Sequence, residues 1–283
     1  MACDLSVHRS RCSPSYSPDL VTSSPLSDLD RFRALLLKIP VPLDVSAFLL
    51  SGHCQGRTLD VEGELSKLDR LAERVPANTL SGVVECLFGE LGFAGDEVSY
   101  LAPENSYLDK VIERKRGIPI SLAVLIIEVA RRCSVQAYGV GMPGHFLVGD
   151  PEKPETFVDP FRGKVLTQAE AEGLFRRMHP SAEFNIQYLS MVSTQAILTR
   201  MLNNLRIIRM KSRSPKALLP ILELALCFGQ PSLPEAKQLA STLEALGRTD
   251  EAARRMEQIA ERSSQGEATE LRALATRLWS QLN

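Results

Sequence analysis

The sequence predicts an α+β fold in which the strands are confined to the middle of the chain. Residues 28–93 and 190–283 carry apolar residues at the spacing of amphipathic helices. Residues 94–189 combine one long apolar helical segment with several short strand-like runs, which is typical of a helix packed on a small antiparallel sheet. We therefore expect an N-terminal helical layer, a mixed core and an all-helical C-terminal region.

Composition excludes several classes of partner. The 283 residues, 44% of them hydrophobic, can bury the core of a soluble globular protein. Because 33 basic and 34 acidic residues leave a formal charge of −1, the chain offers no electrostatic footprint for nucleic acid or an anionic membrane. No run of about 18 apolar residues is present that would span a bilayer. We expect neither nucleic acid nor a membrane as a partner.

The spacing of the cysteines and the composition of the N-terminal residues indicate the cellular compartment of the protein. The six cysteines show no C-x-x-C spacing, which argues against a disulfide framework and a zinc site. A reducing cytoplasm is the simplest location, and neither a metal nor a cofactor is expected. Residues 1–27 are rich in Ser and Pro and lack the apolar stretch of a secretory signal, so a disordered tail, or alternatively a mis-assigned start, is expected there.

The N-terminal layer is expected to contain four amphipathic helices. Pro42 stands where a first helical turn tolerates a missing N–H, and Gly92 follows the end of the last helix. With the apolar spacing, these end signals give helical segments over 28–37, 42–50, 60–75 and 78–91.

The mixed core is expected to begin with two helices of different character. Ser106 and Asp109 approximate a capping box that opens a helix over 105–116. The next segment, 118–132, has Pro119 in its first turn and is apolar on nearly every face. It is expected to be the buried central helix.

Short strands follow the central helix. Strand signals occur at 136–140, on both sides of a turn between 144 and 160, and at 164–166. Thr167 then caps the acidic first turn of a helix that runs to Met178. This order predicts an antiparallel sheet covered by helices.

The hairpin brings together two chemically active side chains. If residues 150–154 form its loop, the register places His145 directly opposite Asp159. Opposed residues have Cβ atoms roughly 5 Å apart, so Asp159 would accept the imidazole N–H and fix its tautomer. The two residues are then two thirds of a catalytic triad, or, alternatively, a satisfied polar pair in the core.

After Tyr188 the sequence indicates only helices. One tetratricopeptide-type helix pair is clear, over 239–253. Because a lone pair cannot bury its apolar face, we expect the region to dock on the core through the helices around 201–208 and 218–226.

Four segments of the core carry a resemblance to a known family. They are ENSYL from Glu104, GIPISLA over 117–123, GVGMPGHFLV over 139–148 and VDPF over 158–161. Together they resemble the bacterial Sir-B-type transglutaminase-like family with a C-terminal tetratricopeptide-repeat region, over about residues 28–283. The resemblance implies a papain/transglutaminase-like core in which a Cys at the start of the central helix, a strand His and a strand Asp form a triad.

On that pattern the nucleophile is missing. His145 and Asp159 match the family's histidine and aspartate, while Gly117-x-Pro119-x-x-x-Ala123 falls where active members carry Gly-x-Cys-x-x-x-Ala. Pro119 stands in the place of the nucleophile. Because proline has no ionisable group and no backbone N–H, the attacking thiolate and one possible oxyanion donor are both absent.

Two other residues are candidate nucleophiles. Ser121 lies about 200° around the helix from Pro119, so it would face away from the pair and bond locally in the first turn. A shift of the alignment by one turn would instead give a hydrolase that uses Ser121, His145 and Asp159. Cys133 lies about 21 Å along the same helix and cannot reach.

Four polar residues bracket the entrance to the central helix and are candidate ligand contacts: Glu104, Asn105, Arg114 and Arg116. Their alternative roles are helix capping and a solvated basic face. The predicted function is a non-catalytic protein that uses the cleft of a former thiol enzyme to bind a peptide or protein partner. The alternative is a hydrolase or acyltransferase that uses Ser121, or a water activated by His145.

Overall fold

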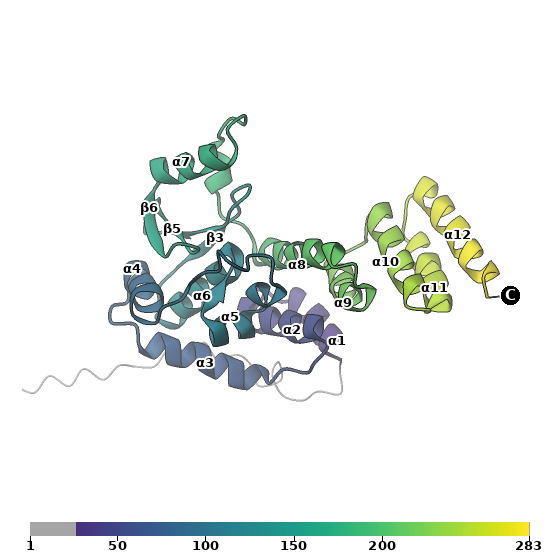
Figure 1. Ribbon diagram of the computed structural model, residues 1–283, viewed down its shortest axis with the longest axis horizontal. Helices are drawn as coiled ribbons and strands as arrows, with labels where there is room; N and C mark the ends of the chain where they lie inside the picture. The colour runs from purple at the N-terminus through teal and green to yellow at the C-terminus, as the bar shows by residue number, and fades with distance from the viewer. Residues whose placement is uncertain (1–26, 283) are drawn as a thin grey trace, which may run out of the picture.

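The computed structural model describes residues 27–282 as a body of helices around a small sheet, with a helical arm at its C-terminal end (Figure 1). Residues 1–26 of the predicted tail lie outside the described residues. Ser27 belongs to the fold, because its hydroxyl accepts a hydrogen bond from Asp30 N and caps the first helix. No helix among the described residues is long and apolar enough to cross a membrane.

The N-terminal layer differs from expectation in two helices. α2 is not amphipathic, since nearly all of its residues are buried among neighbouring helices. The fourth helix is not a continuous α-helix: after Val84 it widens into a π-helix, in which Leu91 N donates to Cys86 O. The elements are α1 (Asp28–Leu36), α2 (Leu43–Gln55), α3 (Val61–Glu73), α4 (Leu80–Val84) and the π-helix η2 (Glu85–Glu90).

The predicted central helix is confirmed, and the prediction of a capping box for the helix before it is wrong. α6 (Pro119–Arg132) is buried along almost its whole length. Before it, the 3-10 helix η3 (Pro103–Ser106) leads into α5 (Leu108–Arg114), which has no side-chain cap. Asp109 does not cap this helix because its carboxylate accepts hydrogen bonds from Gln55 in α2.

A four-stranded antiparallel sheet packs between two helices. β3 (Tyr138–Val140), β4 (Leu147–Asp150), β5 (Lys153–Asp159) and β6 (Lys164–Thr167) lie side by side in that order. In Figure 1 the strands lie below α7 (Gln168–Met178) and above α6. Val148 and Val158 pack with α6, whereas Leu147 and Phe157 pack with α7. The predicted cap of α7 at Thr167 is confirmed.

The predicted hairpin register is wrong by two residues. Gly149 pairs with Phe157, and after a bulge Asp150 pairs with Lys153. The connecting loop is therefore two residues long, and Asp150 Oδ1 accepts a hydrogen bond from Glu152 N at 2.9 Å, which closes it. The turn chemistry of aspartate before proline allows a tighter loop than the one predicted.

A short parallel ladder joins the N-terminal layer to the core. β1 (Ala94–Gly95) pairs with β2 (Arg116–Gly117), immediately before α6. On its other side Gly95 N donates to Phe161 O at 3.0 Å. β1 thus lies between the end of β5 and the start of α6.

The C-terminal helices divide between two hydrophobic cores. α8 (Thr194–Lys211) packs into the main core with α2 and α6, and α9 (Pro215–Ala225) contributes to both cores. The predicted docking through these two helices is confirmed. The main hydrophobic core therefore contains residues from both sides of position 190, where the C-terminal helical region was expected to begin. The remaining elements are η4 (Ile186–Leu189), η5 (Leu226–Phe228), α10 (Leu233–Ala245), α11 (Thr249–Ala260) and α12 (Gln265–Ser280).

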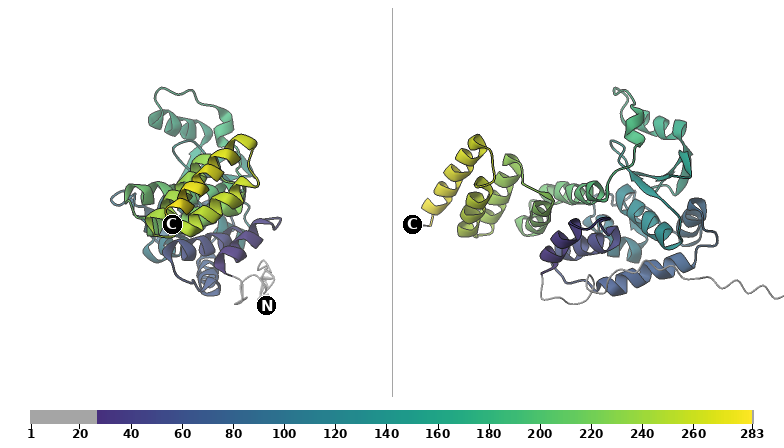
Figure 2. Two further views of the ribbon diagram at one scale, coloured as in Figure 1. Left: turned by 90° about the vertical axis from the view of Figure 1, so that its right-hand side faces the viewer. Right: turned by 180° about the vertical axis from the view of Figure 1, so that it is seen from behind.

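α10, α11 and α12 form an arm that projects from the body (Figure 2). Their apolar residues pack against one another and against one side of α9. The arm also contacts α8, where Arg206 Nε donates to Gln238 Oε1 of α10 at 2.6 Å. The helix pair predicted over 239–253 corresponds to α10 and α11, joined by a turn in which Gly247 has φ +74°.

Candidate functional site

His145 and Asp159 form a buried hydrogen-bonded pair at one end of the sheet. His145 Nε2 lies 2.8 Å from Asp159 Oδ1, and the two side chains are 10% and 2% exposed. The observed register makes them diagonal neighbours: continued by one residue, it sets Leu147 opposite Asp159, and His145 lies two residues before Leu147 on the same side. The expected pairing is confirmed, although the register that predicted it is wrong.

Backbone contacts on both sides hold the pair in place. Asp159 Oδ1 also accepts a hydrogen bond from Phe161 N at 3.0 Å. The carbonyl oxygen of His145 accepts one from Arg200 Nη2 at 2.7 Å, and the Arg200 guanidinium lies 5.3 Å from the centre of the Phe146 ring. α8 therefore supports the segment that carries the histidine, just before β4.

These contacts fix which imidazole nitrogen carries the proton. An ionised carboxylate only accepts hydrogen bonds, so Nε2 of neutral His145 must be the donor and Nδ1 is left as an acceptor. We expect ¹⁵N spectra at pH 8 to show a single Nε2–H tautomer for this residue. Asp159→Ala removes the acceptor and should give a mixture of tautomers. A mixture already present in the unsubstituted protein would contradict the assignment.

The start of α6 lies close to this pair through the short ladder. Phe161 O accepts from Gly95 N, and Gly117 O accepts from Asp96 N at 3.0 Å. Two strand spacings, roughly 10 Å, therefore separate the backbone at Phe161 from that at Gly117. Asp159 and Pro119 each stand two residues from this ladder. The residue at the predicted nucleophile position is a proline in the first turn of α6.

Ser121 is bonded locally. Its side chain is fully buried, and Oγ donates to Asn105 O at 2.6 Å and accepts from Ile118 N at 3.1 Å. The hydroxyl joins the start of α6 to the end of η3. This geometry is the local role expected of a serine in a first helical turn.

Of the four described cysteines, Cys54, Cys86 and Cys133 are buried and Cys227 is half-buried, and none stands in the first turn of α6. Burial is the main cause of a raised pKa for each of Cys54, Cys86, Cys133 and Cys227. They belong to α2, η2, the C-terminal end of α6 and η5. None is a thiolate poised for attack. Cys3 and Cys12 lie outside the described residues.

Asn105 and Arg114 make hydrogen bonds that stabilise the fold. Asn105 is fully buried, and its amide donates to Asp96 Oδ2 at 3.1 Å and to Ser99 O at 2.7 Å. Its side-chain oxygen accepts from Arg114 Nη1 at 2.9 Å. All of its polar groups are therefore engaged within the protein. These bonds hold the loop over residues 96–102, a feature that sequence patterns gave no reason to single out.

An open cavity of about 440 Å³ lies along β1. Of the four predicted ligand contacts, Arg116 lines it and the other three do not. Arg116 Nη1 donates only to two carbonyl oxygens, those of Gly92 and Lys115, and Glu104 is exposed outside the cavity. We call this the β1 cavity; its lining residues are Ala94, Gly95, Asp96, Glu97, Val98, Arg116, Phe161, Arg162 and Lys164.

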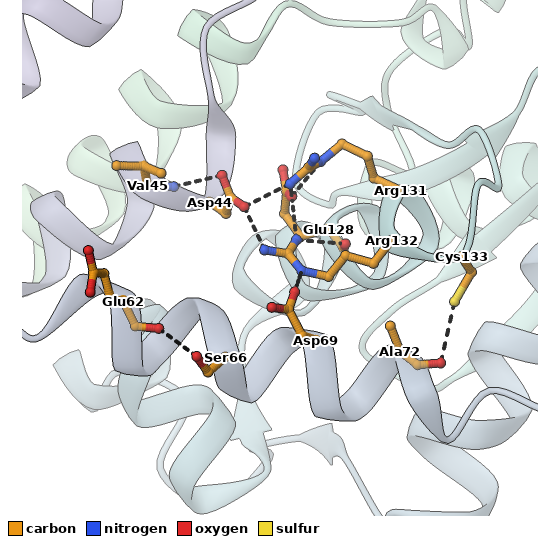
Figure 3. A network of polar contacts seen from close by, with 10 residues as sticks. All are labelled: Asp44, Val45, Glu62, Ser66, Asp69, Ala72, Glu128, Arg131, Arg132 and Cys133. Carbon is orange, nitrogen blue, oxygen red and sulfur yellow. Dashed lines mark hydrogen bonds and ion pairs between the residues drawn. The ribbon is translucent and has the colours of Figure 1, made fainter. Parts of the chain in front are cut away.

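The sequence did not predict the buried charge network that lies at the other end of α6 (Figure 3). Asp44 of α2 accepts hydrogen bonds from Arg131 and Arg132, each at 2.8 Å, and Glu128 accepts from both arginines as well. A glutamate inside an apolar helix, followed by arginines at i+3 and i+4, was the available signal. Nothing in the sequence pointed to Asp44. Within residues 27–282 no three His, Cys, Asp or Glu side chains converge as metal ligands.

Comparison with known proteins finds a family match in the middle of the chain. A family model described as Transglutaminase-like superfamily matches residues 60–203. The "UPF0162 protein" of Xylella fastidiosa (strain 9a5c) is 41% identical over 134 residues, which are 44% of this chain and 47% of that protein. The chain thus spans about half the length of this bacterial relative, and the same holds for the relative from Pseudomonas aeruginosa, at 48%.

Two further proteins are similar to this chain. F-box only protein 21 of Mus musculus is 28% identical over 194 residues, which cover 64% of this chain and 30% of that protein. A crystal structure of menin aligns over 90% of this chain and 69% of its own, with a TM-score of 0.43 and 11% identity. The family match covers just over half of the chain and includes Pro119, His145 and Asp159, so the chain belongs to the transglutaminase-like superfamily.

Proposed function

We propose that this chain is a non-catalytic transglutaminase-like protein that binds a peptide or protein segment beside its His145–Asp159 pair. The observation that carries the proposal is Pro119 at the start of α6, in a chain whose His145–Asp159 pair is intact. A thiol enzyme needs a thiolate and oxyanion donors at that point, and proline supplies neither an ionisable group nor an N–H.

The support for binding comes from what surrounds the pair. The β1 cavity opens along the ladder that joins Phe161 to the start of α6. Its volume is within the roughly 300–1,000 Å³ of typical ligand sites. A cleft that has kept its walls and lost its nucleophile can still hold a former substrate class, because binding contacts and the reacting group are separate parts of such a site.

The enzymatic alternative has weaker support. A hydrolase that uses Ser121 would need its Oγ to donate to the imidazole, and that proton is directed at Asn105 O instead. A water activated by His145 is the remaining enzymatic mechanism. It would act without a covalent intermediate, and the Nδ1 atom of His145 would be its base.

The finer family assignment is part of the same proposal. We place the chain in the Sir-B-type group, with α10 and α11 as a tetratricopeptide-type pair in a cytoplasmic regulatory protein. The antiparallel packing of these helices across the Gly247 turn supports this assignment. One pair together with α12 is too short for a free-standing array, which agrees with the contact that the arm makes with α9.

Thiol chemistry provides a direct test. We expect that alkylating the accessible cysteines with iodoacetamide leaves the binding of peptides selected from a random 12-residue display library unchanged. Pro119→Cys is expected to release no ammonia from glutamine peptides, since a lone thiol has neither oxyanion donors nor a matched substrate channel. An iodoacetamide-sensitive acyl intermediate in the unsubstituted chain would overturn the proposal.

A further inference from the structure

A loop beside the β1 cavity presents large apolar side chains to solvent. Val98, Leu101 and Tyr100 are 96%, 51% and 44% exposed, within four consecutive residues. Single exposed apolar residues are common, but a group of them at the rim of a cavity is characteristic of an interaction surface.

The backbone of this loop is held firmly from beneath. Asp96 Oδ1 accepts a hydrogen bond from Ser99 N at 2.8 Å, and the buried Asn105 amide binds both Asp96 Oδ2 and Ser99 O. These bonds, with Arg114 as a second partner, lower the pKa of Asp96, so the carboxylate stays ionised and keeps them. A loop that is already ordered loses little conformational entropy when a partner binds.

Tyr100 connects the loop to the segment next to the His145–Asp159 pair. Its ring packs edge-on against the ring of Phe161, with 5.8 Å between the centres. The backbone N–H of Phe161 donates to Asp159 Oδ1 at 3.0 Å, and Phe161 also lines the β1 cavity. The apolar loop and the β1 cavity therefore lie beside the buried His145–Asp159 pair.

The charge of the cavity is positive on the side opposite the loop. Arg116, Arg162 and Lys164 line it, and the side chain of Lys164 makes no hydrogen bond or ion pair with a described residue. Arg162 Nε lies 3.9 Å from Asp159 Oδ2, and of the two acidic residues in the lining Asp96 is already bound to Asn105 and Arg114. Glu97 is therefore the acidic residue of the lining that is left to balance Arg116 and Lys164. Cationic side chains without acidic partners, next to exposed apolar ones, complement a ligand that is acidic and apolar.

We infer that the β1 cavity and the 96–102 loop bind a peptide segment in which an acidic side chain lies next to a large apolar one. The carboxylate sits against Lys164 and Arg116, and the apolar side chain packs on Val98 and Leu101. This inference rests on the proposed function and names the chemistry of its partner. A phosphate backbone is a poorer fit, because the cations are confined to one cavity in a chain of net charge −1.

The test uses the full chain and two pairs of matched variants. Peptides are selected from the same random 12-residue display library, and their affinities are measured by fluorescence anisotropy. We expect the selected peptides to be enriched in Asp or Glu next to Leu, Ile, Phe or Trp. Lys164→Glu and Val98→Ser should each weaken binding roughly tenfold or more. The controls are Lys216→Glu and Ile207→Ser, which make the same charge reversal and the same change from a β-branched apolar residue to serine at exposed positions on α9 and α8, and should leave affinity unchanged.

Each outcome decides between the two proposals. Acidic and apolar peptides whose binding weakens with ionic strength and with both cavity variants support the inference. Peptides of another composition, or binding that is insensitive to Lys164→Glu and Val98→Ser, overturn it and leave the proposed binding function standing. Selection of no peptide overturns both. Inorganic phosphate that competes at low millimolar concentration and binds as tightly as the peptides would also overturn the peptide assignment.

Discussion

Asp44→Asn is expected to lower the free energy of unfolding by about 3–5 kcal/mol, which is the usual cost of removing one partner from a buried ion pair. Asp44 is fully buried, and its Oδ2 accepts one hydrogen bond from Arg131 and one from Arg132 (Figure 3). The side chain of Arg132 is only 7% exposed, so water cannot replace the lost carboxylate. The change should lower the melting temperature by roughly 10 °C.

An opposing effect acts through Glu128. Burial, and after it the charge of Asp44, raises the pKa of Glu128 to about 7, while the two arginines act in the other direction. Removing the charge of Asp44 would relieve this repulsion and favour ionised Glu128. The relief is smaller than the loss, because two arginines would then share a single buried carboxylate and the hydrogen bonds of Asp44 Oδ2 would be missing.

Asp69→Asn is the matched control. Asp69 Oδ1 accepts a hydrogen bond from the same Arg132 at 2.7 Å, but the side chain of Asp69 is 62% exposed. Exposed pairs of this kind contribute about 0–1 kcal/mol. Chemical denaturation of the two variants separates the effects. Equal stability of Asp44→Asn and Asp69→Asn would contradict a structural role for the buried network.

Ending the chain after Leu189 is expected to abolish cooperative folding of what remains. The truncation removes apolar side chains of α8 and α9 that fill the main core: Ile197, Leu198, Met201, Leu202, Leu205, Ile221 and Leu224. At about 1.5–3 kcal/mol for each buried side chain, their loss is as large as or larger than the whole stability of a typical domain, about 5–15 kcal/mol. Circular dichroism and light scattering should show an aggregating product without a sharp thermal transition.

A second truncation, after Gln230, provides the comparison. It removes α10 to α12, uncovers one side of α9 at Leu218, Leu219 and Leu222, and takes the partners of Arg206 in α8 away, while the main core stays intact. We expect a cooperatively folding protein with a lower melting temperature. If the shorter chain that ends after Leu189 were monomeric and melted at the temperature of the full chain, the two regions would be independent domains.

Local signals in the sequence predicted the helices well. The apolar run with Pro119 in its first turn gave the central helix, and Thr167 gave the cap of α7. Those features depend on neighbouring residues only. Ser106 and Asp109 carried a similar local signal and misled, because Asp109 has a stronger partner in α2.

Features that depend on distant segments could not be predicted. Asp44 meets its arginines across α2 and α6, and no periodicity links those positions. The hairpin failed for a different reason: a bulge and a two-residue loop shifted the register, although both residues of the His145–Asp159 pair were correctly chosen. Diagonal neighbours on two strands are still within reach of an imidazole side chain, so the prediction that His145 and Asp159 pair holds although the predicted register is wrong.

The central claim is that the site has kept its histidine and aspartate and lost its nucleophile. Intact-mass spectrometry of the full chain, during incubation with glutamine peptides and an amine donor, tests it most directly. The account predicts that the mass of the protein stays unchanged, that no ammonia is released, and that His145→Ala behaves in the same way. A covalent adduct or ammonia release that disappears in His145→Ala would show a working nucleophile or an activated water, and would contradict it.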